Sequence, residues 1–135
     1  MTVTVCLCDK GGMLFNKRRQ SRDSVLIKDF LSLNENEKIF ISPFSEKLFL
    51  DFADLVTVSE NPLADALGGV LFAENLALSS VADKIDKMIV YRWNRSYPAE
   101  FYLDTPPDKI GLKLLSSVDF EGSSHEKITR EIWIR

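Results

Sequence analysis

The chain has 135 residues, a common size for one domain, so we expect a single domain over residues 1–135. Hydrophobic residues make up 45% and charged residues 27%, ordinary values that exclude collagen-like, disordered and disulfide-scaffold proteins. No apolar run reaches the roughly 18 residues of a membrane helix. The N-terminal residues lack the basic start of a signal peptide, so we expect a cytoplasmic protein with no membrane partner.

Charge is unevenly distributed along the chain. The net charge is −3, which argues against a protein that coats nucleic acid. Residues 10–28 carry six basic groups and one acid, whereas residues 29–86 carry eleven acids and three lysines. Residues 87–135 are nearly balanced, with eight basic and seven acidic groups. This pattern favours a confined basic site for a small anion on an otherwise acidic protein.

The first half of the chain predicts short strands alternating with short helices. Apolar residues alternate with small or polar ones from Val3 to Leu7, which indicates a strand that ends in a glycine-containing turn. Ser21 or Asp23 can cap a helix over 24–33 whose apolar side chains fall near one face. We further expect a strand at 38–42, an amphipathic helix starting at Ser45, a strand at 55–58 and a helical turn at 62–66.

The second half of the chain continues this alternation. We expect strands at 70–72, 88–91, 112–120 and 128–134, a capped helix at 79–86, a loop at 105–108 and a turn at 122–124. The order of these elements predicts an α+β fold. A single mostly antiparallel or mixed β-sheet would carry two to four short helices on one face.

Three polar segments stand out from this framework, and the first precedes the helix at 24–33. Its candidate ligand-binding residues are Asn16, Arg18, Arg19, Ser21 and Arg22. Guanidinium groups bind phosphate or carboxylate through paired hydrogen bonds, and the start of a helix adds backbone donors for an anion. A solvated basic face beside an ordinary capped helix is the alternative. A Walker phosphate loop is excluded, because no Gly-Lys-Ser/Thr follows at the right spacing.

The second segment follows the strand at 88–91. Its candidate ligand-binding residues are Trp93, Asn94, Arg95 and Tyr97. An aromatic ring flanked by arginines can stack on a base or sugar while the guanidinium groups hold phosphates. The alternative is a tryptophan in the core with arginines facing solvent.

The third segment holds the only histidine of the chain. Its candidate ligand-binding residues are Ser123, Ser124, His125, Lys127 and Thr129. If the protein is an enzyme, His125 and Glu126 are the candidate catalytic residues, because histidine transfers protons near neutral pH. Adjacent residues on a strand face opposite ways, which weakens this pair and favours a distant carboxylate such as Asp23. A hydrogen-bonded histidine with a structural role is the alternative.

Several chemistries are disfavoured by the residues present. Cys6 and Cys8 would share a strand face about 6.6 Å apart, which suits packing in a reduced protein better than a disulfide. A zinc site would require more histidine or cysteine ligands, so we expect no metal and no cofactor. The chain has neither the Gly-x-Ser-x-Gly motif of α/β hydrolases nor a Rossmann fingerprint.

The same three segments resemble those of a known family. The chain is similar to small proteins of low-GC Gram-positive bacteria and their mobile elements, which share a pattern near GGMLFN-RRQSRD, a central WNRSYP and a terminal FEGSSHEKIT. The resemblance covers nearly the whole chain. Such proteins are often labelled ribonuclease Z, yet enzymes of that name resemble metallo-β-lactamases and bind two metals through a histidine-rich motif. A chain with one histidine lacks that motif, so the resemblance implies no particular mechanism.

Three functions follow from these patterns. The first is binding or sequestering a small phosphorylated ligand, such as a nucleotide or cyclic nucleotide signal, in an arginine-rich pocket, as a phage or mobile-element anti-defence protein would. The second is a metal-independent phosphodiesterase or ribonuclease that uses His125, a carboxylate and arginines on short RNA. The third is an immunity or anti-defence protein that binds a protein partner through its acidic residues 29–86. We rank ligand binding first, and a homo-oligomeric state stays open.

Overall fold

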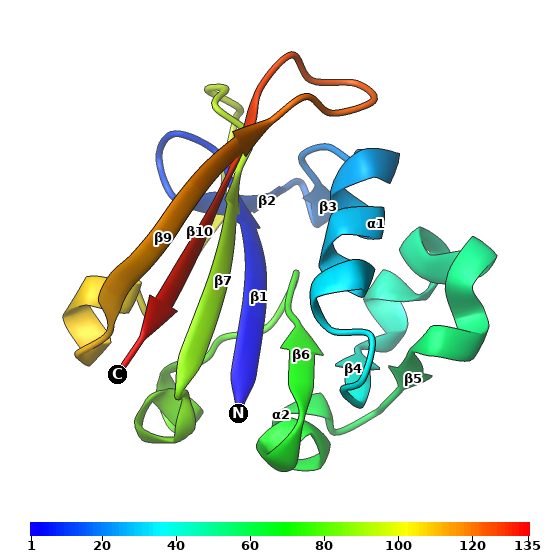
Figure 1. Cartoon of the computed structure of the whole chain (residues 1–135), viewed down its shortest axis with the longest axis vertical. Coiled ribbons are helices and arrows are strands. Elements are labelled where there is room, and N and C mark those ends of the chain that lie inside the picture. The colour runs from blue at the N-terminus through cyan, green and yellow to red at the C-terminus, as the bar shows by residue number, and fades with distance from the viewer.

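A computed structural model describes all residues from 1 to 135, and its backbone forms two sheets (Figure 1). The strands of the main sheet are β1 Thr2–Leu7, β4 Ile39–Ile41, β5 Thr57–Val58, β6 Val70–Phe72, β7 Lys87–Arg92, β9 Lys113–Phe120 and β10 Ile128–Ile134. The strands of the small sheet are β2 Gly12–Phe15, β3 Arg18–Arg19 and β8 Phe101–Tyr102. The α-helices are α1 Ser24–Leu33 and α2 Pro62–Asp65. The 3₁₀ helices are η1 Pro43–Leu55, η2 Ala66–Gly68, η3 Ser79–Lys84 and η4 Pro107–Ile110.

The main sheet is mixed, with the strand order β5-β4-β6-β1-β7-β10-β9. Strand β1 lies at its centre and pairs in parallel with β6 and β7. Strand β10 runs antiparallel to both β7 and β9. Parallel pairing brings the carboxyl ends of β1, β6 and β7 to one edge of the sheet, where binding sites of open α/β sheets are found. The predicted α+β class with a mixed sheet is confirmed.

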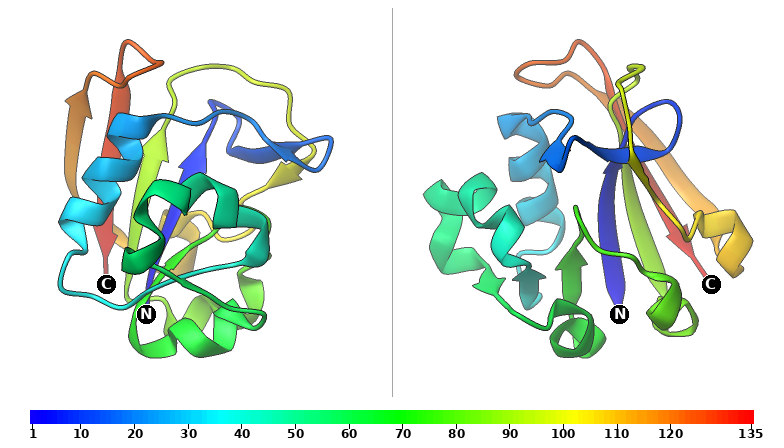
Figure 2. Two further views of the ribbon diagram at one scale, coloured as in Figure 1. Left: turned by 90° about the vertical axis from the view of Figure 1, so that its right-hand side faces the viewer. Right: turned by 180° about the vertical axis from the view of Figure 1, so that it is seen from behind.

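Each face of the main sheet carries its own apolar core, because successive side chains of a strand point to opposite faces. On β7, Met88 and Val90 belong to one core, and Ile89 and Tyr91 belong to the other. Helix α1 and the long helix η1 contribute to the second core and lie together on that face (Figure 2). The small sheet and the six-residue helix η3, through Val81, contribute to the first core.

Helix α1 covers the same residues as the helix predicted from the sequence. It begins after Asp23, whose backbone is extended and whose carboxylate accepts hydrogen bonds from the first turn. Its buried side chains are Leu26, Ile27, Phe30 and Leu31, which share one face at helical spacing. Burial of each such side chain contributes about 1.5–3 kcal/mol, so packing on the sheet holds this short helix in place.

Helix η1 differs from the amphipathic helix expected to start at Ser45. It begins at Pro43, follows the 3₁₀ pattern and is interrupted by non-helical backbone at Phe49 and Phe52. The ring of Phe49 packs edge-on against Phe30 at 6.0 Å and Phe72 at 5.1 Å. These tertiary contacts seat the phenylalanine in the core and outweigh the preference for a regular helix.

The small sheet was missed by the sequence analysis, because β3 and β8 have two residues each and β2 only four, which is too short to show a period. The expected loop at 105–108 contains the start of η4. None of the helices is long and apolar enough to cross a membrane.

Candidate functional site

The three polar segments meet at the edge of the main sheet where β1 and β7 end. The first segment leads into α1, the second follows β7, and the third forms the connection between β9 and β10, which arches over this edge (Figure 1). Figure 2 shows the same neighbourhood from two further sides. Segments that are about 100 residues apart in the chain, such as those of Asp23 and Ser124, are joined there by hydrogen bonds.

His125 lies at the centre of this meeting point, with a side chain that is 2% exposed. Its Nδ1 atom lies 3.2 Å from Oδ2 of Asp23, and its Nε2 atom lies 3.0 Å from the hydroxyl of Tyr97 and 3.2 Å from that of Ser21. The ring stacks on Trp93 with centroids 4.5 Å apart. With the proton of a neutral ring on Nδ1, the Asp23 carboxylate accepts it and Nε2 accepts a hydroxyl proton.

The carboxylate of Asp23 accepts more hydrogen bonds than a helix cap requires. One oxygen accepts from the N–H groups of Val25, Leu26 and Ser123, at 3.0, 3.2 and 2.9 Å. The other accepts from the N–H of Ser124 at 2.8 Å. Burial opposes ionisation, but the hydrogen bonds from Ser124, Ser123, His125 and Leu26 outweigh it and hold the pKa of Asp23 well below its usual value.

The amino terminus of α1 was expected to offer backbone donors to an anionic ligand. In the structure the protein uses these donors itself. The N–H of Ser24 donates to the hydroxyl oxygen of Ser123 at 3.0 Å, and the N–H of Ile27 donates to the carbonyl of Asp23. Together with the two bonds from Val25 and Leu26 to the Asp23 carboxylate, these contacts give every N–H group of the first helical turn a partner within the protein. These backbone N–H groups are therefore not free for a ligand anion, which has to be bound by side chains.

Gly122 allows the third segment to approach Asp23. A Cβ atom at this position would come within 3 Å of Asp23 Oδ2 and of the Ile128 side chain. The turn at 122–124 can therefore close over the carboxylate only because the first residue has no side chain. Sequence analysis located the turn but missed this reason for its glycine.

The candidates of the first segment separate in space. Asn16 forms the tight turn of the β2–β3 hairpin, with a φ of 55° next to Lys17 at 60°, as two-residue hairpin loops require. Arg18 is exposed on the hairpin, whereas Arg19 is paired with Glu74. Arg22 is exposed and lines the cleft described below. The predicted cluster of three arginines is therefore not formed around one point.

The remaining candidates of the second and third segments have different roles. Asn94 donates through Nδ2 to the carbonyl of Lys127 at 3.2 Å and to the hydroxyl of Thr129 at 2.9 Å, which joins the two segments. Arg95 is exposed beside a hollow formed by residues 121–126. Glu126 is exposed and is not among the hydrogen-bond partners of His125. The adjacent pair of His125 and Glu126 is thus not formed: both residues lie in the connection between β9 and β10, Glu126 faces solvent, and Asp23 takes the carboxylate position beside His125.

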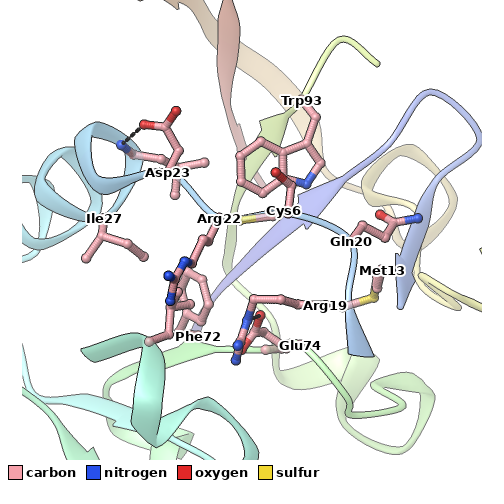
Figure 3. A pocket seen from close by; sticks show the side chains of 14 residues that line it. Cys6, Met13, Arg19, Gln20, Arg22, Asp23, Ile27, Phe72, Glu74 and Trp93 are labelled. Atoms are coloured by element: carbon pink, nitrogen blue, oxygen red, sulfur yellow. Dashed lines mark hydrogen bonds and ion pairs between the residues drawn. The ribbon is translucent and has the colours of Figure 1, made fainter. Parts of the chain in front are cut away.

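Two adjoining cavities border α1 and η1. The outer one is an open cleft of about 510 Å³ whose lining includes Arg22, Ile27, Lys47, Leu48 and Phe52. The inner one is nearly filled and leaves about 20 Å³, beneath the β2–β3 hairpin (Figure 3). Both are bordered by Arg22, Ile27 and Leu48. Sequence analysis missed the contribution of η1, whose amphipathic pattern was the available signal.

No group of three or more histidine, cysteine, aspartate or glutamate residues is placed to hold a metal ion. The acidic segment 29–86, expected to bind a protein partner, includes exposed carboxylates such as those of Glu35, Glu37 and Glu60. Binding of a partner through that segment stays a prediction.

Comparison with known proteins identifies the fold. No protein-family model matches the chain, and no curated protein sequence matches it significantly. Among solved structures, the chain is similar to a dihydrofolate reductase from Enterococcus faecalis complexed with NADP(H) and RAB-propyl. The TM-score is 0.67, the sequence identity is 10%, and the match covers 99% of this chain and 95% of the reductase. The protein therefore has a dihydrofolate reductase-like fold.

Proposed function

We propose that the protein binds a small phosphorylated ligand, with a nucleotide as the expected class, in the cleft between α1 and η1. The volume of about 510 Å³ falls within the range of about 300–1,000 Å³ that is usual for small-molecule sites. The observation that carries the proposal is the pair of unpaired cations in its lining. None of the ion pairs of the chain involves Arg22 or Lys47.

The rest of the cleft lining suits a ligand with both a phosphate and a ring. Ile27, Leu48 and Phe52 supply apolar surface. The hydroxyl oxygen of Ser123 accepts from the helix, so its own hydrogen is available to a ligand oxygen. The cleft also contains Asp51, which repels phosphate but can accept from a ring N–H or a sugar hydroxyl.

The fold provides general support for this class of ligand. The similar reductase was solved with NADP(H) and a second small ligand, so a protein of this architecture can hold a nucleotide. At 10% identity this comparison supports a shared fold alone. The argument that this chain binds a nucleotide comes from the residues that line its cleft.

The buried His125 favours binding over hydrolysis. A general acid or base must reach the proton that it transfers, within about 3 Å. The imidazole of His125 is covered by Trp93, and its two nitrogens face protein groups. We assign it a positioning role, in which it holds Asp23 and Ser124 at the rim of the cleft. Recovery of the ligand from the complex in chemically intact form would agree with sequestration by an anti-defence protein.

The proposal is tested by thermal unfolding and titration calorimetry with AMP, ADP, cyclic di-AMP, NADP⁺ and a short RNA. A ligand at a hundredfold excess over its Kd stabilises the folded state by about 2.7 kcal/mol. This corresponds to a rise in Tm on the order of 10 °C. Arg22→Ala with Lys47→Ala should abolish the rise.

The matched control is Arg18→Ala with Lys109→Ala, which removes the same charge from exposed sites outside the cavities. It should keep the full ligand response. A panel in which no ligand raises Tm, or in which both double variants respond alike, would contradict the proposal. Appearance of shortened RNA or linearised dinucleotide in the recovered ligand would replace binding by hydrolysis.

A further inference from the structure

We propose that Arg19 and Gln20 form an inner subsite for a second polar group of the ligand, and that Glu74 occupies this subsite in the ligand-free protein. This inference rests on the proposed function, because the inner cavity adjoins the outer cleft along Arg22, Ile27 and Leu48. It adds the chemistry that the deeper part of the ligand must have.

The inner cavity has the lining of a binding pocket but almost no free space. Its walls come from β1, the β2–β3 hairpin, α1, η1 and the end of β6 (Figure 3). Apolar side chains, among them Met13, Leu26, Phe72 and Trp93, form much of the lining. Yet only about 20 Å³ is left, room for one water-sized molecule. Arg19 and Glu74 extend across the lower part of this space (Figure 3).

The contact between Arg19 and Glu74 is bidentate. Nε and Nη2 of Arg19 each lie 2.8 Å from a carboxylate oxygen of Glu74, and the hydroxyl of Ser45 donates to the same carboxylate at 2.7 Å. The guanidinium also lies over the ring of Phe44, with its central carbon 5.1 Å from the ring centroid. This is the geometry with which arginine binds the carboxylate or phosphate of a ligand. A protein carboxylate therefore fills an anion-binding position.

Gln20 supplies an independent sign of an unfilled site. Its amide nitrogen donates to the sulfur of Cys8 at 3.3 Å and to the carbonyl of Pro98 at 3.0 Å, which settles the orientation of the amide. Its oxygen Oε1 is buried and has no hydrogen-bond partner. In Figure 3 this oxygen lies on the side of the amide that faces the cavity. A buried acceptor without a partner is unfavourable, so a ligand N–H or O–H placed there is favoured.

These two features define the ligand chemistry. The inner part of the ligand carries a carboxylate or phosphate that replaces Glu74 on Arg19, and an N–H or O–H that donates to Gln20. Exchange of one anion for another keeps the guanidinium of Arg19 paired, while the displaced Glu74 carboxylate gives up its hydrogen bonds from Arg19 and Ser45. Strand β3, which carries Arg19, has two residues and pairs with one neighbouring strand, so it can shift without breaking the main sheet.

The binding test uses inorganic pyrophosphate as the probe and calorimetry as the readout. Glu74→Gln keeps the size of the side chain and removes its charge, which frees Arg19. If Glu74 occupies the subsite in nine-tenths of the molecules, its removal tightens apparent binding by about tenfold. Arg19→Gln combined with Glu74→Gln should lose this gain. Glu74→Asp serves as a second variant if Glu74→Gln unfolds, and should tighten binding less.

The matched control is Glu131→Gln, which breaks another bidentate arginine pair, that of Arg92, outside both cavities. It should bind pyrophosphate as the unaltered protein does. Equal affinities for Glu74→Gln and Glu131→Gln would overturn the inner subsite. Arg22→Ala with Lys47→Ala could leave pyrophosphate affinity unchanged while Glu74→Gln raises it in full. That result would contradict the proposed outer site and support the inner subsite. If no variant binds pyrophosphate, the inner subsite fails, and the outer cleft is then judged by the nucleotide panel alone.

A second readout needs no ligand. Trp93 lines the inner cavity, and in a Trp133→Phe background it is the only tryptophan, so its fluorescence reports on the cavity. Opening the contact with Glu74→Gln should increase quenching of Trp93 by acrylamide, a neutral molecule insensitive to the charge change. Glu131→Gln in the same background should leave quenching unchanged. Quenching that is identical in the two variants would show that Glu74 does not close the cavity.

Discussion

Asp23→Asn tests the polar network that joins the three segments. The substitution keeps the shape of the side chain, but it removes the charge and turns one acceptor oxygen into a donor. That donor would face the N–H of Ser124 and Nδ1 of His125, which now donate to the carboxylate at 2.8 and 3.2 Å. The helix cap itself can survive through the remaining oxygen, which accepts from Val25 and Leu26.

The expected loss of stability comes from the unmatched donors. Each buried polar group left without a partner costs about 1–3 kcal/mol, and two such groups give a loss of about 2–6 kcal/mol. A domain of this kind is usually stable by about 5–15 kcal/mol, so the loss is a large fraction of the total. Urea unfolding followed by circular dichroism at pH 7 measures it. Asp86→Asn, which alters an exposed carboxylate paired with the N-terminus, is the control and should change stability little.

The pH dependence of this difference provides a second check. Because the pKa of Asp23 is lower in the folded protein than the value of about 3.9 in an unfolded chain, its charge stabilises the fold fully above that pH. The stabilisation is lost as the pH falls through the folded-state pKa. The difference in the free energy of unfolding between the unaltered protein and Asp23→Asn should therefore become smaller below a pH of about 4. The reasoning would be refuted if Asp23→Asn lost no more unfolding free energy at pH 7 than Asp86→Asn does. It would also be refuted if the loss caused by Asp23→Asn stayed the same in acid.

Two further predictions concern the packing around this network. Gly122→Ala should destabilise the fold by about 1–3 kcal/mol, because its Cβ would overlap Asp23, whereas Gly68→Ala meets nothing within 4 Å and serves as the control in the same urea assay. Equal losses in the two variants would argue against the close approach. Tyr91 should titrate well above an ordinary tyrosine, because burial and the hydrogen bond to Asp29 raise its pKa. Stability should then fall as the pH rises above about 10, where the unfolded chain ionises, and Tyr91→Phe should lessen this fall.

Local patterns in the sequence predicted most of the secondary structure. The helix at 24–33 and its cap at Asp23 follow from residues within one turn of each other, and the central strand at 88–91 follows from a continuous apolar run. Such signals depend on neighbours in the chain, so they can be read without the fold. The sequence analysis missed the β2–β3 hairpin, because the register of this hairpin depends on a positive φ at two residues that are not glycine.

The sequence by itself determined the α+β class and the three polar segments that stand apart from its strands and helices. Only the tertiary structure decided how those segments are used. Arg19 and Arg22 are three residues apart, yet one is held by Glu74 and the other opens into the cleft. Asp23 and His125 are 102 residues apart and form one hydrogen-bonded unit. Such pairings depend on the order of the strands in the sheet and on burial, which act across distances in the chain that local sequence patterns do not span.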